Sequence, residues 1–424
     1  MSATPPIALT PYLTTAHNVL WAVAEDFAAE HIAPDVKHME ASPNQVERRI
    51  PQLLAKQGWF GVTIPTRYGG MEAGHVAKTV LIHRTAVVSA AAAAILQASL
   101  IPVGALQNWG TAGQKEEWLP QVADGSLLPS IAVTEPFAGG HIGGIKTAAE
   151  RRGKDWVISG MKAHIGNSHI SRVHVVVART AEAGVTASRA LTAFLVEYDR
   201  KGVTLAPHSA GLGLHGFTAG CLRLDKVRIP AANVLGEVGQ GLYVAQSSSI
   251  LYGRPNLTAV SLGIHEALVR TTADFLSTRP RYDGHLSDHP VVRDRLGAMQ
   301  ARYQTALTAT YSAVHLLDNR ASCDGELIGA KHTGHQFAVA SAQDAMELHG
   351  AAAVNGSSLV QRVFRDCQHT YSPAGTGEFQ RIHLANTALG TESIQWSERL
   401  AAEAAWTHPD PAPSLRPPRA TAPS

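Results

Sequence analysis

A glycine-rich segment near the end of the chain has the outline of a catalytic loop that lacks a catalytic side chain. Residues 371–381 read Tyr-Ser-Pro-Ala-Gly-Thr-Gly-Glu-Phe-Gln-Arg, so that Ala374 stands directly before Gly375 and Thr376. A carboxylate in such a loop could remove a proton next to a carbonyl group if it lay within hydrogen-bond reach. Alanine cannot accept a proton. Any reaction at this loop must therefore take its base from another residue.

A second segment, in the middle of the chain, offers hydrogen-bond donors. Residues 133–140 read Val-Thr-Glu-Pro-Phe-Ala-Gly-Gly. Backbone N–H groups and the Thr134 hydroxyl of such a loop can donate to a polar ligand without adding bulk. Taken alone, residues 133–136 are more simply a turn that Thr134 caps before Pro136. The flanking sequence has to decide between these two interpretations.

The composition is that of an ordinary soluble globular protein. A chain of 424 residues is too long for one simple core and indicates two or three packed domains. The hydrophobic fraction is 45%, the charged fraction 17% and the net charge +2, which argues against a dedicated nucleic-acid surface. Cys221, Cys323 and Cys367 are far apart and form no CxxC pair. We expect a reduced protein without a metal site.

The apolar segments indicate where in the cell the protein is expected to reside. The N-terminal residues show no basic region followed by an apolar one, so no secretory signal is visible. The apolar run at 87–100 consists mostly of Ala and Ser and is shorter than the about 20 residues that a membrane span needs. We expect this run to be a buried helix, and the protein to be cytoplasmic with no membrane partner.

The spacing of apolar residues changes twice along the chain. Apolar residues recur at helical spacing from about 9 to 128, short β-type runs broken by Gly and Asp occupy 131–234, and helical periodicity returns from 241 to about 396. We therefore predict an α+β fold with a helical domain at 1–128, a β domain at 129–237 and a helical domain at 238–396. Residues 397–424, which are rich in proline towards their end, are expected to form a disordered tail.

Five segments, in order, resemble those of the acyl-CoA dehydrogenase superfamily over about residues 53–389. They are Trp-Phe-Gly-Val-Thr-Ile-Pro with Tyr-Gly-Gly at 59–70, Val-Thr-Glu-Pro at 133–136, Gly-Met-Lys at 160–162, the segment 227–241 that ends in Gly-Gln-Gly, and the loop 371–381. The resemblance implies an N-terminal helical domain, a middle β-barrel domain and a C-terminal four-helix bundle. It also implies FAD between the β domain and the bundle, and a homodimer or homotetramer.

Residue roles can be transferred by position. The residues that would bind FAD are Val133, Thr134, His164, Gly166, Arg279, Glu347, Gly350, Thr376 and Glu378, and those that would line the acyl group are Gly140, Arg254 and Ala374. In the family, the residue matching Arg279 reaches the diphosphate of a neighbouring subunit's FAD. Glu378 could instead be a carboxylate that stabilises the first turn of a helix.

The chain departs from the family around the flavin ring and at the base. His164 and Gly166 stand where the family has Trp and Thr or Ser, while Gly140 and His141 replace Ser and Asp. The family places its catalytic Glu at one of two positions. These positions are occupied here by Ala374 and Gly253, both of which lack a carboxylate. Loss of a general base typically lowers the rate by about 10²–10⁴-fold.

Three functions remain compatible with these departures. The first is α,β-dehydrogenation of an acyl thioester of CoA or of a carrier protein, with an electron-transfer flavoprotein or oxygen as acceptor. Its base could be Tyr252, Tyr371, His164 or His141, although each residue type is more often a packing or surface residue. The second is flavin-dependent oxygenation, for which Gly140, Gly166 and Gly253 would enlarge the pocket. The third is a catalytically silent FAD-binding subunit. We favour the first.

Overall fold

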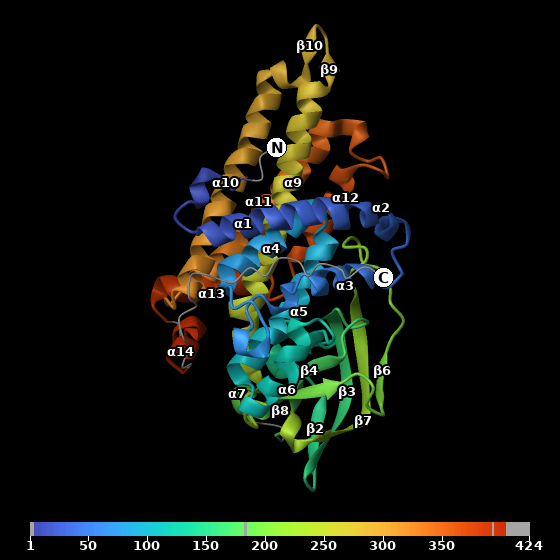
Figure 1. The fold of residues 1–424 in the computed structure, drawn as a ribbon, viewed down its shortest axis with the longest axis vertical. Helices are drawn as coiled ribbons and strands as arrows, with labels where there is room; N and C mark the ends of the chain where they lie inside the picture. Colours follow the sequence, from blue (N-terminus) through green and yellow to red (C-terminus); the bar gives the residue numbers. More distant parts are fainter. Residues whose placement is uncertain (1–3, 182–184, 392–393, 404–424) are drawn as a thin grey trace, which may run out of the picture.

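The computed structural model describes residues 4–181, 185–391 and 394–403, which form helices around and beyond one sheet (Figure 1). The N-terminal helices are α1 (Thr15–Phe27), α2 (Ala33–Ala41), α3 (Arg49–Lys56), α4 (Gly74–Val88), α5 (Ala90–Trp109) and α6 (Ala112–Ala123). The helices after the sheet are α8 (Gly241–Ser248), α9 (Arg254–Thr278), α10 (Pro290–Asp318), α11 (Asp324–His349), α12 (Leu359–Cys367), α13 (Gly377–Leu389) and α14 (Trp396–Glu403).

The sheet occupies the middle of the chain and has the order β6-β7-β3-β2-β4-β5-β8, with β1 paired parallel to β4. Its strands are β1 (Pro129–Ala132), β2 (Ala148–Arg152), β3 (Asp155–Gly166), β4 (Val173–Arg179), β5 (Leu191–Glu197), β6 (Val203–Leu205), β7 (Ala219–Pro230) and β8 (Val234–Leu235), and the short helix α7 (Ala187–Ala190) precedes β5. Side chains from several strands form an apolar core of their own, which includes Trp156 of β3, Phe194 of β5 and Leu222 of β7. The predicted α+β architecture is confirmed.

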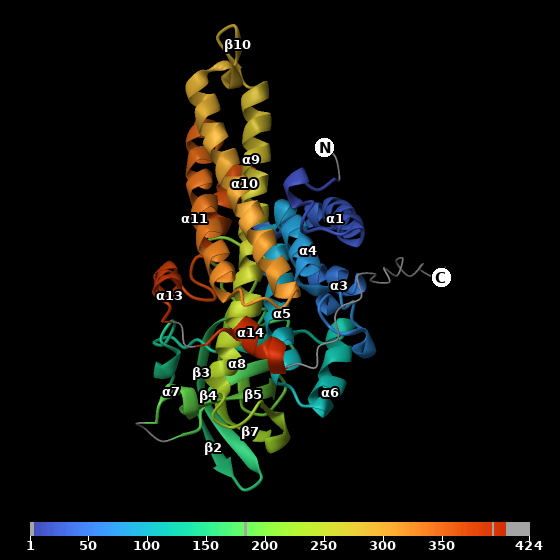
Figure 2. The ribbon, with the colours of Figure 1, turned by 90° about the vertical axis from the view of Figure 1, so that its left-hand side faces the viewer.

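A hairpin marks the far end of the molecule. Strands β9 (Pro280–Arg281) and β10 (Gly284–His285) connect α9 to α10. In both views, this hairpin lies at one end of the long axis and the sheet lies at the other (Figures 1 and 2). The N-terminal helices pack against the side of the bundle through α4, and α5 also reaches the sheet through β1.

Helix α5 is the apolar element expected from the sequence. It is long and apolar enough to cross a membrane, but 89% of its apolar window is buried inside the fold. It ends at Trp109, and Thr111 caps the start of the next helix, α6, with a capping box. The Thr111 hydroxyl accepts from Gln114 N at 3.2 Å, and the Gln114 side chain accepts from Thr111 N at 3.0 Å. The expectation of a buried helix is confirmed.

Residues 397–403, which were expected to belong to a disordered tail, are helical. Helix α14 extends from Trp396 to Glu403, and the Trp396 side chain is only 2% exposed. Its ring packs near the rings of Trp109 and Tyr243. The N–H groups of Trp396 and Ser397 donate to the Asp324 carboxylate at 2.7 and 2.9 Å. Burial of one large aromatic ring thus fixes this helix, and residues 404–424 lie outside the described part of the chain.

A buried carboxylate on α9 joins three helices. Glu266 accepts two hydrogen bonds from Arg84 of α4, at 2.8 and 2.9 Å, and one from the Tyr303 hydroxyl of α10, at 2.8 Å. Arg270 of α9 forms a further ion pair with it. Burial disfavours the charged form of Glu266, but the surrounding donors and cations outweigh it and hold the pKa of Glu266 well below its ordinary value. This carboxylate fixes the position of α9, which begins at the site described below.

We predict that Glu266→Gln lowers the free energy of unfolding by about 3–5 kcal/mol, because the buried Arg84 would lose its closer anionic partner and keep only Glu25, at 3.5 Å. Urea denaturation followed by circular dichroism measures the change. The matched control is Glu150→Gln, which removes the partner of Arg152 from a pair in which both side chains are 65% exposed. It should change stability by less than about 1 kcal/mol. Equal effects of the two substitutions would contradict a structural role for Glu266.

Candidate functional site

The segment 133–135 is fixed by one buried ion pair. Lys162, on β3, is fully buried, and its ammonium donates to the Val133 carbonyl and to the Glu135 carboxylate, each at 2.8 Å. The backbone N–H groups of Lys146 and Thr147 also donate to Glu135, at 2.7 and 2.9 Å. Burial lowers the pKa of Lys162 to about 8, against the opposing effect of Glu135. The carboxylate remains charged because these donors outweigh its burial and lower its pKa.

This arrangement turns a donor outwards at Thr134. The Val133 carbonyl points to Lys162, and the Thr134 carbonyl accepts from Ala163 N at 2.9 Å. Because carbonyl and N–H point in opposite directions across a trans peptide, the Thr134 N–H is directed away from Lys162. Thr134 is half-buried, so it can present this donor to a ligand without full exposure to water. The geometry fits the polar edge of a flavin ring.

Phenylalanine 217 fills the space beside Gly166. His164 is exposed with a φ of 56°, and Gly166 ends the same strand. A Cβ atom on Gly166 would lie 2.9 Å from the Phe217 ring and 3.2 Å from the Ala98 Cβ. The side chain that the family has at this position is thus replaced by a ring from a distant loop. The expectation that Gly166 enlarges the pocket is wrong.

The same compensation occurs at Gly140. A Cβ atom there would lie 2.3 Å from the ring of Phe379, which extends from α13 and is 41% exposed. The expectation of extra space at Gly140 is therefore also wrong. Nothing in the sequence near Gly140 or Gly166 indicates these partners, because each ring comes from a residue far along the chain.

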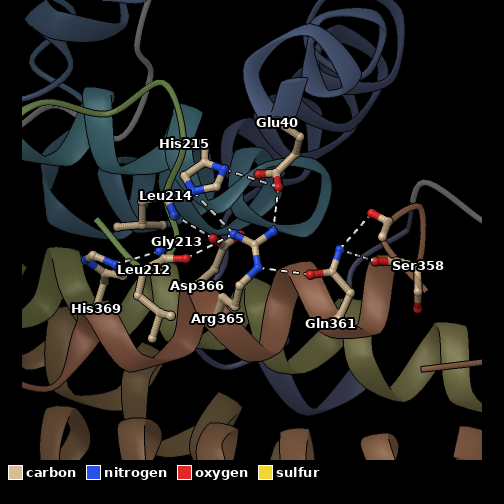
Figure 3. Close-up of polar contacts among 11 residues, drawn as sticks. Glu40, Leu212, Gly213, Leu214, His215, Ser358, Gln361, Arg365, Asp366 and His369 are labelled. Carbon is tan, nitrogen blue, oxygen red and sulfur yellow. Dashed lines mark hydrogen bonds and ion pairs between the residues drawn. The ribbon is translucent and has the colours of Figure 1, made fainter. Parts of the chain in front are cut away.

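The loop that carries Phe217 is tied to α12 by a polar network (Figure 3). The Asp366 carboxylate accepts from Leu214 N at 2.6 Å, and His369 Nε2 accepts from Gly213 N at 2.9 Å. The Arg365 guanidinium donates to the Leu212 carbonyl at 3.0 Å and pairs with Glu40, on α2. Burial raises the pKa of Asp366 to about 6. Helix α12 and the turn after it, which carries His369, therefore hold residues 212–214 at three backbone positions.

The chain continues from α12 into the loop that contains Ala374. The ammonium of Lys331, on α11, donates to the carbonyls of Tyr371, Pro373 and Gly375, at 3.1, 2.7 and 2.7 Å. Arg254 Nε donates to the Ala374 carbonyl at 3.2 Å. Ala374 has a φ of 56°, in the left-handed region that a residue with a Cβ adopts at a cost. Two buried cations thus fix a strained loop, and neither was identified from the sequence as a loop anchor.

Gly253 and Ala374 lie side by side. A Cβ atom on Gly253 would be 3.1 Å from the Ala374 Cβ, and the next neighbours, at 3.8 Å, are Ile101 and a backbone oxygen. Gly253 ends a π-helical turn, η7 (Ser249–Gly253), of a kind that often occurs at functional sites. The two positions at which the family carries its base therefore converge on one spot, and neither provides a carboxylate.

The four predicted bases differ in their environments. The Tyr252 hydroxyl is buried and donates to Gln107 at 2.9 Å, and burial raises its pKa. The Tyr371 hydroxyl donates to Glu378 at 2.7 Å, an interaction that raises the pKa of Tyr371. His141 and His164 are both exposed. The two phenols are thus poor proton acceptors, whereas the two imidazoles are accessible.

The residues expected at the diphosphate and adenosine lie elsewhere. Arg279 lies between α9 and the β9–β10 hairpin, and Gly350 follows α11 directly; the hairpin is at the end of the molecule away from the sheet (Figures 1 and 2). An open cavity of about 490 Å³ lies beside them, lined in part by Phe275, His349 and Ser358. The rings of Phe275 and His349 stack at 4.0 Å. Glu347 pairs instead with Arg295.

The remaining flavin candidates belong to the Ala374 loop. Thr376 is half-buried and precedes α13, and Glu378 lies exposed in its first turn. Gln380 donates to the Gly375 carbonyl at 2.7 Å. The predicted site residues thus form two groups, one around Thr134 and Ala374 and one around Arg279. Within the described ranges, no group of three or more His, Cys, Asp or Glu side chains is placed to bind a metal ion.

Comparison with known proteins identifies the family. Models of the acyl-CoA dehydrogenase N-terminal, middle and C-terminal domains match residues 14–126, 130–227 and 239–389. An acyl-CoA dehydrogenase of Bacillus subtilis is 28% identical over 380 residues, covering 89% of this chain and 99% of the relative. A 3-(aryl)acrylate reductase of Clostridium sporogenes is 26% identical, with 89% and 100% covered.

Solved structures agree on the fold. Butyryl-CoA dehydrogenase from Megasphaera elsdenii superimposes with a TM-score of 0.86 at 24% identity, covering 89% of this chain and 99% of that one. A prolyl acyl carrier protein oxidase gives a TM-score of 0.82 at 24% identity, with the same coverage. The chain, with its helical, sheet and helical parts in the family's order, belongs to the acyl-CoA dehydrogenase superfamily and is an FAD-dependent oxidoreductase that acts on CH–CH groups.

Proposed function

We propose that this enzyme dehydrogenates an acyl thioester and removes the α-proton without a carboxylate at position 253 or 374. The observation that carries the proposal is the convergence of Gly253 and Ala374 on one spot beside the ordered loop 371–375. FAD, when bound, accepts the hydride that leaves the β-carbon. The role of the protein is to hold the flavin and the acyl group together and to accept the proton.

Within this proposal, Val133, Thr134, His164 and Gly166 hold the flavin ring, with Thr376 and Glu378 at its other side. Arg279, Glu347 and Gly350 hold the dinucleotide end. Because this second group lies at the opposite end of the bundle, we propose that it serves the FAD of a second subunit in a homo-oligomer. Gly140, Arg254 and Ala374 line the acyl group.

The base is proposed to be an imidazole. Of the four predicted bases, Tyr252 and Tyr371 already donate their hydroxyl protons to neighbours, and their pKa values are raised. His141 and His164 are both exposed, and a neutral imidazole has one ring nitrogen that can accept a proton. His141 follows Gly140, which lies against α13, whereas His164 lies on the strand that supports the flavin segment.

The carrier and electron acceptor are proposed from relatives. One solved structure of the fold is a prolyl acyl carrier protein oxidase, and one relative is a subunit of a caffeyl-CoA reductase-Etf complex. A CoA or carrier-protein thioester as substrate and an electron-transfer flavoprotein as acceptor are therefore the first choices to test. The oxygenase alternative depended on a widened pocket, but Phe217 and Phe379 fill two of the three glycine positions.

We predict that a panel of acyl-CoA and acyl-carrier thioesters contains a substrate that bleaches the FAD absorbance near 450 nm under anaerobic conditions, without NAD(P)H. Flavin reduction by the thioester alone is the signature of dehydrogenation. Absorbance spectroscopy in a sealed cuvette measures it. Oxygen consumption that requires a separate flavin reductase would support oxygenation instead, and a protein that binds FAD but is bleached by none of the thioesters would support the silent subunit.

We also predict that Gly166→Ser destabilises the protein by about 1–3 kcal/mol through overpacking against Phe217. In a Phe217→Ala background the cost should fall by about 1 kcal/mol or more, because the two side chains then no longer compete for space. Thermal denaturation of the four proteins of this double-mutant cycle measures the coupling. Gly139→Ser is the control, since a Cβ atom at Gly139 meets nothing within 4 Å. An additive cycle would contradict the packing described for Phe217.

A further inference from the structure

Two buried cations face the loop at Ala374, and neither forms an ion pair within the described residues. The side chains of Arg254 and Lys331 belong to residues that are 5% and 2% exposed. Arg254 lies next to Gly253 in the chain, and Lys331 donates to the carbonyls on both sides of Ala374. Positive charge that is removed from water without an anionic partner is costly, so proteins usually pair it.

The donors of these two cations are unequally satisfied. Lys331 uses its ammonium for three carbonyl groups. Arg254 uses Nε for the Ala374 carbonyl, but its buried Nη1 has no hydrogen-bond partner in the described part of the chain. Burial lowers the pKa of Lys331 to about 7 and that of Arg254 to about 10, as expected when cations lack close anions.

No carboxylate of the described chain forms an ion pair with Arg254 or Lys331. The charge of Asp324 acts on Arg254 through space, and its two oxygens accept the N–H groups of Trp396 and Ser397. Gly253 precedes Arg254 in the chain, and Ala374 lies between the two residues whose carbonyls Lys331 binds. Neither residue contributes a charge. Gly253 and Ala374 are therefore neutral, whereas the side chains buried next to them, Arg254 and Lys331, carry positive charge.

We propose that the acyl group of the substrate carries its own carboxylate, which lies beside Gly253 and Ala374 and balances Arg254 and Lys331. This inference rests on the proposed function, since it names the class of acyl thioester that the site accepts: a dicarboxylic acid bound through one of its two carboxyl groups. The free carboxylate places a negative charge beside the loop that these two cations hold. It fills the space that a side-chain carboxylate would take at either position, so the enzyme needs neither glutamate for charge balance.

The test compares thioesters that differ only in a terminal methyl or carboxylate. Butyryl-CoA and succinyl-CoA form one such pair, and valeryl-CoA and glutaryl-CoA form the next. Isothermal titration of the FAD-loaded, full-length protein should give a dissociation constant at least about tenfold lower for the carboxylate member of one pair, a difference of about 1.4 kcal/mol. Equal or tighter binding of both neutral members would overturn the proposal, and this comparison needs no variant.

A matched pair of variants tests the position. Ala374→Glu places a fixed carboxylate beside Gly253 and should remove the preference for the carboxylate thioester through like-charge repulsion. Ala374→Gln has nearly the same size without charge and should retain a preference. Loss of the preference in both variants would mean that size alone matters and would overturn the assignment to this spot. Melting temperatures measured with FAD establish that each variant is folded.

Failure of this inference is distinguishable from failure of the proposed function. If neutral thioesters bind and bleach the flavin as well as the carboxylate ones do, the enzyme is a dehydrogenase and only the substrate class is wrong. If no thioester of either kind binds, the proposed function fails and the inference fails with it. If carboxylate thioesters bind preferentially without bleaching, the substrate class stands and the reaction has to be revised.

Discussion

The carboxylate of Glu266 determines where the central helix of this enzyme lies. It sits where α4, α9 and α10 meet, and it accepts from Arg84 and Tyr303 inside the core. A helix held at this point has a defined position and direction, so its first turn presents Gly253 and Arg254 to the Ala374 loop. At the same helix, Gly263 lies directly against α4, where a Cβ atom would approach the His83 carbonyl to 2.6 Å. The geometry of the site therefore begins in the core, well away from the flavin segment.

Charge is used differently on the two sides of the site. On the sheet side, Lys162 and Glu135 form a closed pair that fixes the backbone at Thr134 and leaves no net charge. On the bundle side, Lys331 and Arg254 fix the backbone at Ala374 without a carboxylate, so positive charge remains. Both solutions immobilise a loop through a cation that binds carbonyl groups. Only the second leaves a field that a ligand can feel.

The sequence predicted the architecture well, because it depends on local patterns. The strands β1 to β8 lie almost entirely within the region 131–234 in which short β-type runs were found. The spacing of apolar residues was less informative about which face of a helix is buried. Val19 and Val23 are apolar residues of α1, yet both are exposed, while Trp21 and Ala24 are buried. Contacts to α4 decide that orientation, and one helix considered alone does not contain them.

The candidate site was predictable only in part. Position in a motif located Thr134, Gly253 and Ala374, but it could not reveal that Gly253 and Ala374 touch. Phe217 lies about fifty residues from Gly166 along the chain, and its packing there depends on the tertiary fold. Lys331 carried no signal either, because a lysine in a helix is ordinarily solvated, and its burial follows from three carbonyls of a distant loop.

The network between Arg365, Asp366 and residues 212–214 has a mechanical consequence. The chain passes from these two side chains into the Ala374 loop within a few residues, so the ring of Phe217 and the methyl group of Ala374 are attached to one rigid body. We therefore expect the Phe217 ring and the Ala374 methyl group to move together. Phe379 lies outside this network and is 41% exposed, so its ring is freer to change position than the ring of Phe217.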